Sequence, residues 1–383
     1  MTKRPLRRTF LFLLNAALIN TACAIQPQQA AQPVVADPAG GDAPTSRTPA
    51  APNQFSQDVF QQEIIFEGQP ASNLTQHTPR SEGADLDPSL DRSGRIMIFA
   101  STRHSRFSHL YIKAVDGSAC TQITDESAND AQPVFSPDGK RIAFASDRGG
   151  QWDIWVAQSD GRNPQQLTST PWPELHPSWS PDGKRLVYCR VNPREGRGEL
   201  WTCPLENPGE KRFVGEGLFP SWSPTGDKIA YQRARLRGSR WFSIWTLKLE
   251  SNNALFPTEI AADPDKAFIA PAWSADGRQI AFVAIQFDTN SDNSSKNTPS
   301  SAPKRSEIGV VDADGGGLML LTNGEGENYS PHWAIDGRIY FTSRTDNAEN
   351  IWSLQPLDAA IAAEPAWRAI DHRAARVNST DEP

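Results

Sequence analysis

One short phrase recurs along the chain and limits the folds that are open to it. Its clearest copy runs from Pro177 to Gly183, PSWSPDG, and joins a proline, an aromatic residue and a four-residue turn. Aligned on the first proline, the copies begin at Pro88, Pro133, Pro177, Pro220, Pro271 and Pro331. The spacings are 45, 44, 43, 51 and 60 residues. A repeat of this period without a 3.6-residue periodicity is typical of propeller blades.

The residues of each copy favour antiparallel strands. In Ser-Pro-Asp-Gly, proline presets φ and glycine takes the left-handed conformation of a tight turn. Alternating apolar residues follow, as in 141–145, then a third apolar run such as 154–156 and a short fourth strand ending near Thr168. A single blade buries too little surface to be stable. The sequence therefore predicts an all-β fold, a six-bladed β-propeller of four-stranded antiparallel blades around a channel.

The repeated SPDG phrase with its preceding aromatic residue resembles the WD40-like repeats of TolB-type propellers in bacterial envelopes. The resemblance covers residues 60–371 and is specific for fold, whereas such propellers serve many functions. TolB has a folded α/β domain before its propeller. Here low-complexity sequence and one strand-like segment occupy that place, so contacts of the TolB domain are not carried over.

The first 24 residues are typical of an export signal. Basic residues precede the apolar stretch 10–19, which is too short to span a membrane, and small residues follow it. Two cleavage interpretations stay open. The residues before Cys23 resemble a lipobox, which predicts a lipid on Cys23, while cleavage after Ala24 fits ordinary signal peptidase. Arg7 and Arg8 also resemble part of a twin-arginine signal, although a basic segment that contains two arginines explains them as well.

The remaining segments give the expected domain organisation. Residues 25–56 are rich in Ala, Pro and Gln and are expected to be a disordered tether. The propeller is expected over 57–373, followed by a flexible tail over 374–383. The strand-like segment 63–67 is expected to pair with C-terminal strands and close the ring.

The net charge limits the classes of partner, and the cysteine content limits the redox and metal-binding motifs that the chain can contain. The formal net charge of −7 over 383 residues does not suggest nucleic acid. Cys120, Cys189 and Cys203 form no CxxC motif, and buried free thiols are favoured over a disulfide between Cys189 and Cys203.

No catalytic motif appears: the chain lacks GxSxG, HExxH, P-loop and dinucleotide-binding patterns. Among the six histidines, His176 and His332 lie beside the prolines expected to begin innermost strands, so they could approach the channel. Some TolB-like propellers are lyases that hold a metal with channel histidines. Packed or solvated histidines are nevertheless favoured, and no cofactor is predicted beyond a divalent cation considered for the channel.

Acidic residues recur three or four positions before the prolines, and a candidate channel mouth is formed by Asp85, Asp130, Glu174, Glu216 and Glu327 together with His176 and His332. These carboxylates could bind a cation or a basic peptide. The favoured alternative is that each carboxylate caps its own loop by accepting backbone N–H groups.

Basic residues gather in the loops between second and third strands. Blade 1 has Arg103, His104 and Arg106, blade 3 has Arg190, Arg194 and Arg197, and blade 5 has Lys296, Lys304 and Arg305. The strongest cluster, the basic rim, is Arg233, Arg235, Arg237, Arg240 and Trp241 in blade 4, and it is the candidate partner-binding site. Ordinary solvated charge is the alternative.

These features favour an exported, non-enzymatic propeller that binds an envelope protein or peptide, a monomer that reaches the membrane only through a lipid on Cys23. An alternative is a polysaccharide lyase or hydrolase with a channel metal. A second is a glycan-binding module in which Trp152, Trp172 and Trp241 stack on sugars.

Overall fold

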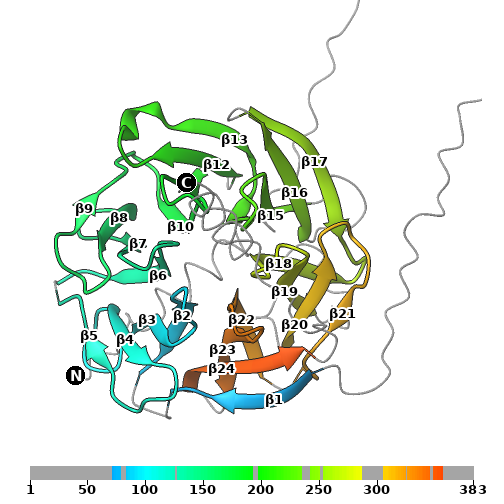
Figure 1. Cartoon of the computed structure of the whole chain (residues 1–383), viewed down its shortest axis with the longest axis horizontal. Helices are drawn as coiled ribbons and strands as arrows, with labels where there is room; N and C mark the ends of the chain where they lie inside the picture. The colour runs from blue at the N-terminus through cyan, green and yellow to red at the C-terminus, as the bar shows by residue number, and fades with distance from the viewer. Residues whose placement is uncertain are drawn as a thin grey trace, which may run out of the picture.

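The computed structural model describes residues 71–78, 83–125, 127–192, 197–234, 242–250, 253–286, 305–324, 326–345 and 348–356. The described strands form six four-stranded antiparallel blades arranged in a ring, which confirms the predicted fold (Figure 1). The predicted export signal, the tether, the tail and Cys23 lie outside the described residues. Among the described elements, no helix is both long and apolar enough to cross a membrane.

Each blade runs from an innermost strand outward. Blades 1 to 3 contain β2 (Asp85–Leu90), β3 (Ile96–Ser101), β4 (His109–Ala114) and β5 (Thr121–Gln122); β6 (Asp130–Phe135), β7 (Arg141–Ser146), β8 (Asp153–Gln158) and β9 (Gln165–Gln166); β10 (Glu174–Trp179), β11 (Arg185–Asn192), β12 (Arg197–Pro204) and β13 (Arg212–Glu216). A 3-10 helix, Pro208–Glu210, precedes β13.

The second half of the ring repeats this order. Blades 4 to 6 contain β14 (Leu218–Trp222), β15 (Lys228–Ala234), β16 (Phe242–Glu250) and β17 (Asn253–Ala261); β18 (Lys266–Trp273), β19 (Gln279–Gln286), β20 (Arg305–Asp312) and β21 (Met319–Leu320); β22 (Glu327–Trp333), β23 (Ile339–Thr345), β24 (Ala348–Pro356) and β1 (Ala71–Gln76). One parallel bridge, Ser306 to Glu327, joins blades 5 and 6.

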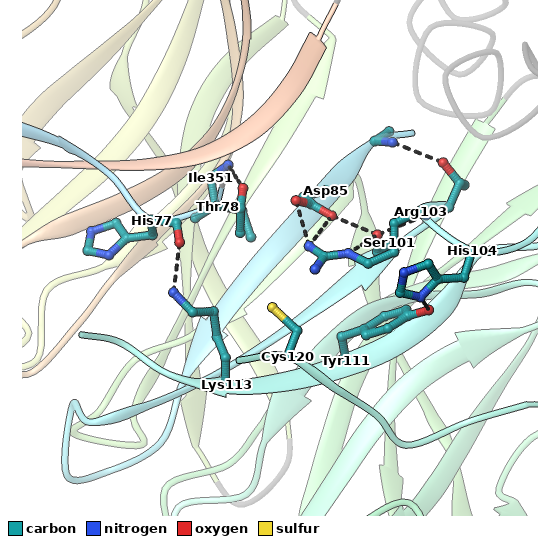
Figure 2. A network of polar contacts seen from close by, with 12 residues as sticks. His77, Thr78, Asp85, Ser101, Arg103, His104, Tyr111, Lys113, Cys120 and Ile351 are labelled. Carbon is teal, nitrogen blue, oxygen red and sulfur yellow. Dashed lines mark hydrogen bonds and ion pairs between the residues drawn. The ribbon is translucent and has the colours of Figure 1, made fainter. Parts of the chain in front are cut away.

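The ring closes because β1, the first described strand, pairs antiparallel with β24 and becomes the outer strand of blade 6. The segment 63–67, which we expected in this role, lies outside the described residues. After β1, His77 N–H donates to the Ile351 carbonyl at 2.8 Å, and Ile351 N–H donates to Thr78 Oγ1 at 3.0 Å. Lys113 of blade 1 donates to the His77 carbonyl at 2.7 Å, so the closing segment is bound to the blades on both sides (Figure 2).

One aromatic residue on each second strand fills the core. These residues are at most 2% exposed: Phe99, Phe144, Tyr188, Tyr231, Phe282 and Phe341. In register they face a third-strand aromatic residue, except that Phe282 faces Gly309. A Cβ on Gly309 would lie 2.6 Å from the Phe282 ring, so glycine is required there. Burying each such side chain stabilises the fold by roughly 2–3 kcal/mol.

The SPDG phrases form the predicted turns. Their glycines have φ between 65° and 84°: Gly94, Gly139, Gly183, Gly226, Gly277 and Gly337. In blade 2 the Ser136 hydroxyl donates to Asp138 at 2.6 Å and accepts from Arg141 N–H at 2.9 Å. The serine and aspartate therefore close the turn, which explains why the phrase recurs.

The repeated prolines do not begin the innermost strands, as we expected, but lie within them at a β-bulge. In all six innermost strands the pairing register shifts around the proline. The residue before each proline has φ between 51° and 55°. Proline is tolerated at a bulge because it has no N–H to contribute to the ladder. A left-handed non-glycine residue costs about 1–2 kcal/mol, so the surrounding contacts must hold each bulge in place.

Candidate functional site

The bulges present one side chain from each blade at the innermost strand. We call these residues the pre-proline ring: Asp87, Gln132, His176, Phe219, Ala270 and Ser330. Gln132 and Ala270 are each 8% exposed, and the other four side chains are partly exposed. The proline is constant, but the residue before it differs in every blade. The ring therefore has six different side chains, each held by the same β-bulge.

Members of the ring contact one another across blade boundaries. Ser330 donates to Asp87 Oδ1 at 2.5 Å, and Gln132 Nε2 lies 3.2 Å from His176 Nε2. The His176 and Phe219 rings are 3.7 Å apart between centroids. Together with the hydrogen bond from the Gln132 backbone N–H to the Asp87 carboxylate, these contacts make a continuous series from blade 6 through blades 1, 2 and 3 to blade 4.

Each bulge also frees a backbone N–H group, and three of these groups bind a side chain of the preceding blade. Asp87 N–H donates to Thr342 Oγ1 at 3.2 Å, and His176 N–H to Gln132 Oε1 at 2.8 Å. Ala270 N–H donates to the fully buried Gln232 at 2.9 Å. Hydrogen bonds from the preceding blade thus fix the backbone of these three ring residues.

His332 has a different position from His176, because it follows its proline. Its Nε2 accepts a hydrogen bond from Leu90 N–H at 3.1 Å. Ser89 accepts from Phe135 N–H at 3.4 Å, and Ser178 from Trp222 N–H at 2.9 Å, in the same way. The imidazole of His332 therefore does in blade 6 what a serine hydroxyl does in blades 1 and 3.

Desolvation keeps the His176 and His332 side chains neutral. Burial lowers the pKa of His176 to about 3 and that of His332 to about 4. Gln132 must donate to His176 Nε2, since that amide nitrogen carries only donors. Burial also raises the pKa of Asp87, against the hydrogen bond from Ser330. His176 and His332 belong to blades 3 and 6 and are not brought together.

The predicted acidic channel mouth divides into different arrangements, and Asp85 and Asp130 form buried ion pairs in it. Arg103 binds both oxygens of Asp85 at 2.8 Å, and Ser101 donates to Asp85 Oδ1 at 2.6 Å (Figure 2). Arg148 binds Asp130 in the same way, at 2.8 and 3.0 Å. Side chains of the second-to-third loop, not backbone N–H groups of the residue's own loop, thus neutralise these carboxylates.

The other three acidic residues differ from this pair. Glu327 accepts from Arg344 at 3.2 Å, and Arg344 also binds Glu349 at 2.6 Å. Glu216 is exposed at the end of β13. Glu174 is fully buried, and neither of its carboxylate oxygens has a hydrogen-bond partner. The five residues therefore do not form one open acidic surface.

Three described arginines of the basic loops fold back onto their own blades. Arg103 stacks on the Phe99 and Tyr111 rings at 5.2 Å, Arg190 on Trp201 at 4.2 Å, and Arg233 on Trp245 at 5.2 Å. Such stacking contributes to the fold. Arg235, Arg237, Arg240 and Trp241 lie outside the described residues, so the basic rim stays a prediction beyond Arg233.

Two remaining predictions are decided by burial. Trp152 is only 7% exposed and lies in the core, so the expectation that it stacks on sugars is wrong; Trp172 is partly exposed, and Trp241 lies outside the described residues.

Cys120, Cys189 and Cys203 are free, and Cys189 and Cys203 are buried, as expected. Burial raises the pKa of the Cys189 thiol to about 12.

The sequence analysis missed the pre-proline ring. The signal was present, because the proline recurs six times while its preceding residue is never the same. Alternation of apolar residues could not reveal the ring, since a bulge interrupts the two-residue period at that position.

Comparison with known proteins places the chain among propellers. Residues 151–381 match the family described as the Tricorn protease N-terminal β-propeller domain, and residues 69–198 match the TolB β-propeller domain. A protein of Agrobacterium tumefaciens described as a TolB has a TM-score of 0.53 at 18% identity, over 71% of this chain and 90% of that protein. Oligogalacturonate lyase from Vibrio parahaemolyticus has a TM-score of 0.50 at 12% identity, over 75% and 94%.

TolB from Acinetobacter baumannii is similar at 19% identity and a TM-score of 0.48, and this chain spans 64% of its length. At these identities the likeness concerns the fold alone, and it includes both a lyase and TolB proteins. From the match over residues 151–381 and the six blades, we conclude that the chain belongs to the family of the Tricorn protease N-terminal β-propeller domain, with a first third that is similar to the TolB β-propeller domain.

Proposed function

We propose that this chain is an exported, non-enzymatic propeller of the cell envelope that binds a protein or peptide at the pre-proline ring. The observation that carries this proposal is a contrast within the repeat: the residues that build each blade recur, whereas the six ring residues all differ. Turn glycines, prolines and core aromatics recur because every blade needs them. The residue before the proline does not recur, so the fold alone does not determine it.

The ring has a polar side and an apolar side. Ser330, Asp87, Gln132 and His176 supply hydrogen-bonding groups from four consecutive blades, while Phe219 and Ala270 supply apolar surface. A peptide segment with polar and apolar side chains fits such a surface, because backbone amides need both donors and acceptors. Phe219 is the aromatic member, and aromatic side chains often dominate binding energy.

Binding is favoured over catalysis by the way the polar ring residues are used. His176 is neutral, and its one basic ring nitrogen, Nε2, already accepts a hydrogen bond from Gln132. A general base instead needs a free lone pair within reach of the proton that it removes. Location in the envelope is supported by the basic and apolar N-terminal segment, and attachment there would depend on a lipid on Cys23.

Photo-cross-linking tests the proposal. A benzoylphenylalanine placed at Phe219 reports on the ring, and the same residue at Phe256, 73% exposed on the outer strand β17, is the matched control. In cells, we expect a discrete envelope-protein adduct from position 219 that is missing from position 256. No adduct at 219, or the same adduct at both positions, would argue against the pre-proline ring.

A further inference from the structure

Asp87 is the only acidic residue of the pre-proline ring, and the ring contains no lysine or arginine. His176 is neutral, so it does not balance the charge of Asp87. The Asp87 side chain is partly exposed on β2, the innermost strand of blade 1. It accepts from the Ser330 hydroxyl of blade 6 at 2.5 Å and from the backbone N–H of Gln132 in blade 2. The two adjacent blades therefore fix the position of the Asp87 carboxylate.

Both hydrogen bonds to Asp87 come from neutral donors, which leave its negative charge uncompensated. Among the described residues, the charged group that shifts the pKa of Asp87 is Glu349, which is acidic as well. Burial, which is the larger effect, and Glu349 both raise this pKa. A carboxylate has about four acceptor positions, so two hydrogen bonds leave room for a further donor. The Asp87 carboxylate thus has both the charge and the free lone pairs that bind a cation.

Carboxylates close to Asp87 are paired within the chain. Asp85, two residues earlier on the same strand, binds Arg103 with both oxygens at 2.8 Å. Asp130, at the position of Asp85 in blade 2, binds Arg148 at 2.8 and 3.0 Å. Asp87 has no such arginine among the described residues. Because an unpaired charge in a desolvated place is costly, a cation from a bound molecule is stabilised beside Asp87.

We infer that Asp87 pairs with an arginine or lysine side chain of the segment that binds the pre-proline ring, an inference that rests on the proposed function of the ring. One carboxylate suits a guanidinium or ammonium group, whereas a calcium ion takes roughly six to eight oxygen ligands. Since His176 Nε2 accepts from Gln132, the imidazole hydrogen is on Nδ1, which can donate to a backbone carbonyl of the segment. Beyond His176, Phe219 offers apolar surface. The expected partner segment therefore combines a basic residue with an apolar one.

Selection from a random library of short phage-displayed peptides on the purified protein tests the inference. We expect the enriched peptides to share an arginine or lysine together with an apolar residue. Selection on Asp87→Asn should lose the preference for the basic residue and keep that for the apolar one, because asparagine retains an acceptor for Ser330 but not the charge. The matched control Asp160→Asn removes the same charge from an exposed carboxylate outside the ring and should enrich the same peptides as wild type.

Fluorescence titration with the most enriched peptide measures the contribution of the pair. Asp87→Asn should bind this peptide about tenfold or more weakly, and so should wild type when citrulline replaces the arginine of the peptide or norleucine its lysine. If the two groups are in contact, both changes together should weaken binding hardly more than either change alone. The melting temperature of Asp87→Asn should be no lower than that of wild type, since the substitution breaks no ion pair within the described part of the chain.

The outcomes separate this inference from the proposed function. Enriched peptides that depend on Phe219 but lack a basic residue, or that bind Asp87→Asn and wild type equally, would overturn the pairing and leave the pre-proline ring as the binding site. If Phe219→Ala enriched the same peptides as wild type, or if no peptide were enriched, the pairing and the ring as a peptide-binding site would both be refuted.

Discussion

The His176 and Phe219 rings lie 3.7 Å apart between centroids and are tilted by 32°, although they belong to neighbouring blades. Both residues precede the proline of their repeat, and both have the left-handed backbone of a bulge. The bulge therefore does more than bend a strand. It brings the variable residues of adjacent repeats into contact and so builds a continuous surface from separate blades.

A first prediction concerns His332. Because its Nε2 accepts from Leu90 N–H, His332→Ala should leave that buried donor unpaired and lower the free energy of unfolding by about 1–3 kcal/mol. His332→Ser should recover about 1 kcal/mol of the loss, since Ser89 and Ser178 fill this role elsewhere. Urea denaturation measures both variants. Equal stability of the alanine and serine variants would refute a structural role for the acceptor.

A second prediction concerns the buried ion pair in blade 2. Arg148→Met should cost about 3–5 kcal/mol, because Asp130 would stay buried without its cation. Adding Asp130→Asn should restore part of this loss by removing the stranded charge. The exposed pair Arg162–Asp160 is the control, and Arg162→Met should change stability by less than about 0.5 kcal/mol. Similar losses from both arginine substitutions would contradict the assignment.

A third prediction concerns the pH dependence of stability. Because the pKa of Asp153 rises from 3.8 to about 6 on folding, the folded protein retains a proton that the unfolded chain releases. Its stabilising contribution is full below about pH 4 and is lost as pH rises through about 6. The side chain of Asp153→Asn does not titrate, so this variant has no such loss of stability as the pH rises. Relative to wild type, it should therefore gain up to about 3 kcal/mol between pH 4 and 7.5.

Comparing the pH dependence of stability of wild type and Asp153→Asn isolates the contribution of Asp153. The lowered pKa values of His176 and His332 act in the opposite direction, since their contribution is present above about pH 6.5 and lost as pH falls. They are common to both proteins and cancel in the difference. Tyr188, Arg190 and Lys211 lie near the carboxyl groups of Asp153 and Glu174 and are the same in both proteins. A difference that stays flat from pH 4 to 7.5 would show that Asp153 titrates normally.

The sequence predicted the frame of this fold because the frame depends on local chemistry. Gly183 must adopt positive φ and Ser180 must bind Asp182, so the same turn appears wherever the phrase recurs. The placing of Pro177 was harder to predict, since a bulge inside a strand and the start of a strand both accommodate proline.

The candidate site was less accessible to sequence reasoning. The sequence analysis assigned Asp85 to an acidic channel mouth and Arg103 to a separate set of basic loops, although the two residues form one ion pair. Loops from different strand ends emerge on the same face, and a charge list does not show which of them meet. The contrast between Glu174 and Asp130 also depends on where Arg190 and Arg148 point.

A fourth prediction concerns the N-terminal segment, which lies outside the described residues. If Cys23 carries a lipid, Cys23→Ala should move the protein from the membrane fraction to the soluble periplasmic fraction. Fractionation followed by immunoblotting measures the change. An unchanged distribution with a mature N-terminus at Ile25 would instead support ordinary signal-peptidase cleavage after Ala24.

The most direct test of the account measures the affinity of purified wild-type protein, Phe219→Ala and Phe256→Ala for the envelope protein cross-linked at position 219. Phe219 contacts His176 within the pre-proline ring, whereas Phe256 is 73% exposed on an outer strand. Loss of a central aromatic contact typically costs about 2 kcal/mol or more, so Phe219→Ala should bind at least tenfold more weakly. Phe256→Ala should bind like wild type. Unchanged affinity of a folded Phe219→Ala variant would contradict the claim that the pre-proline ring is the binding site.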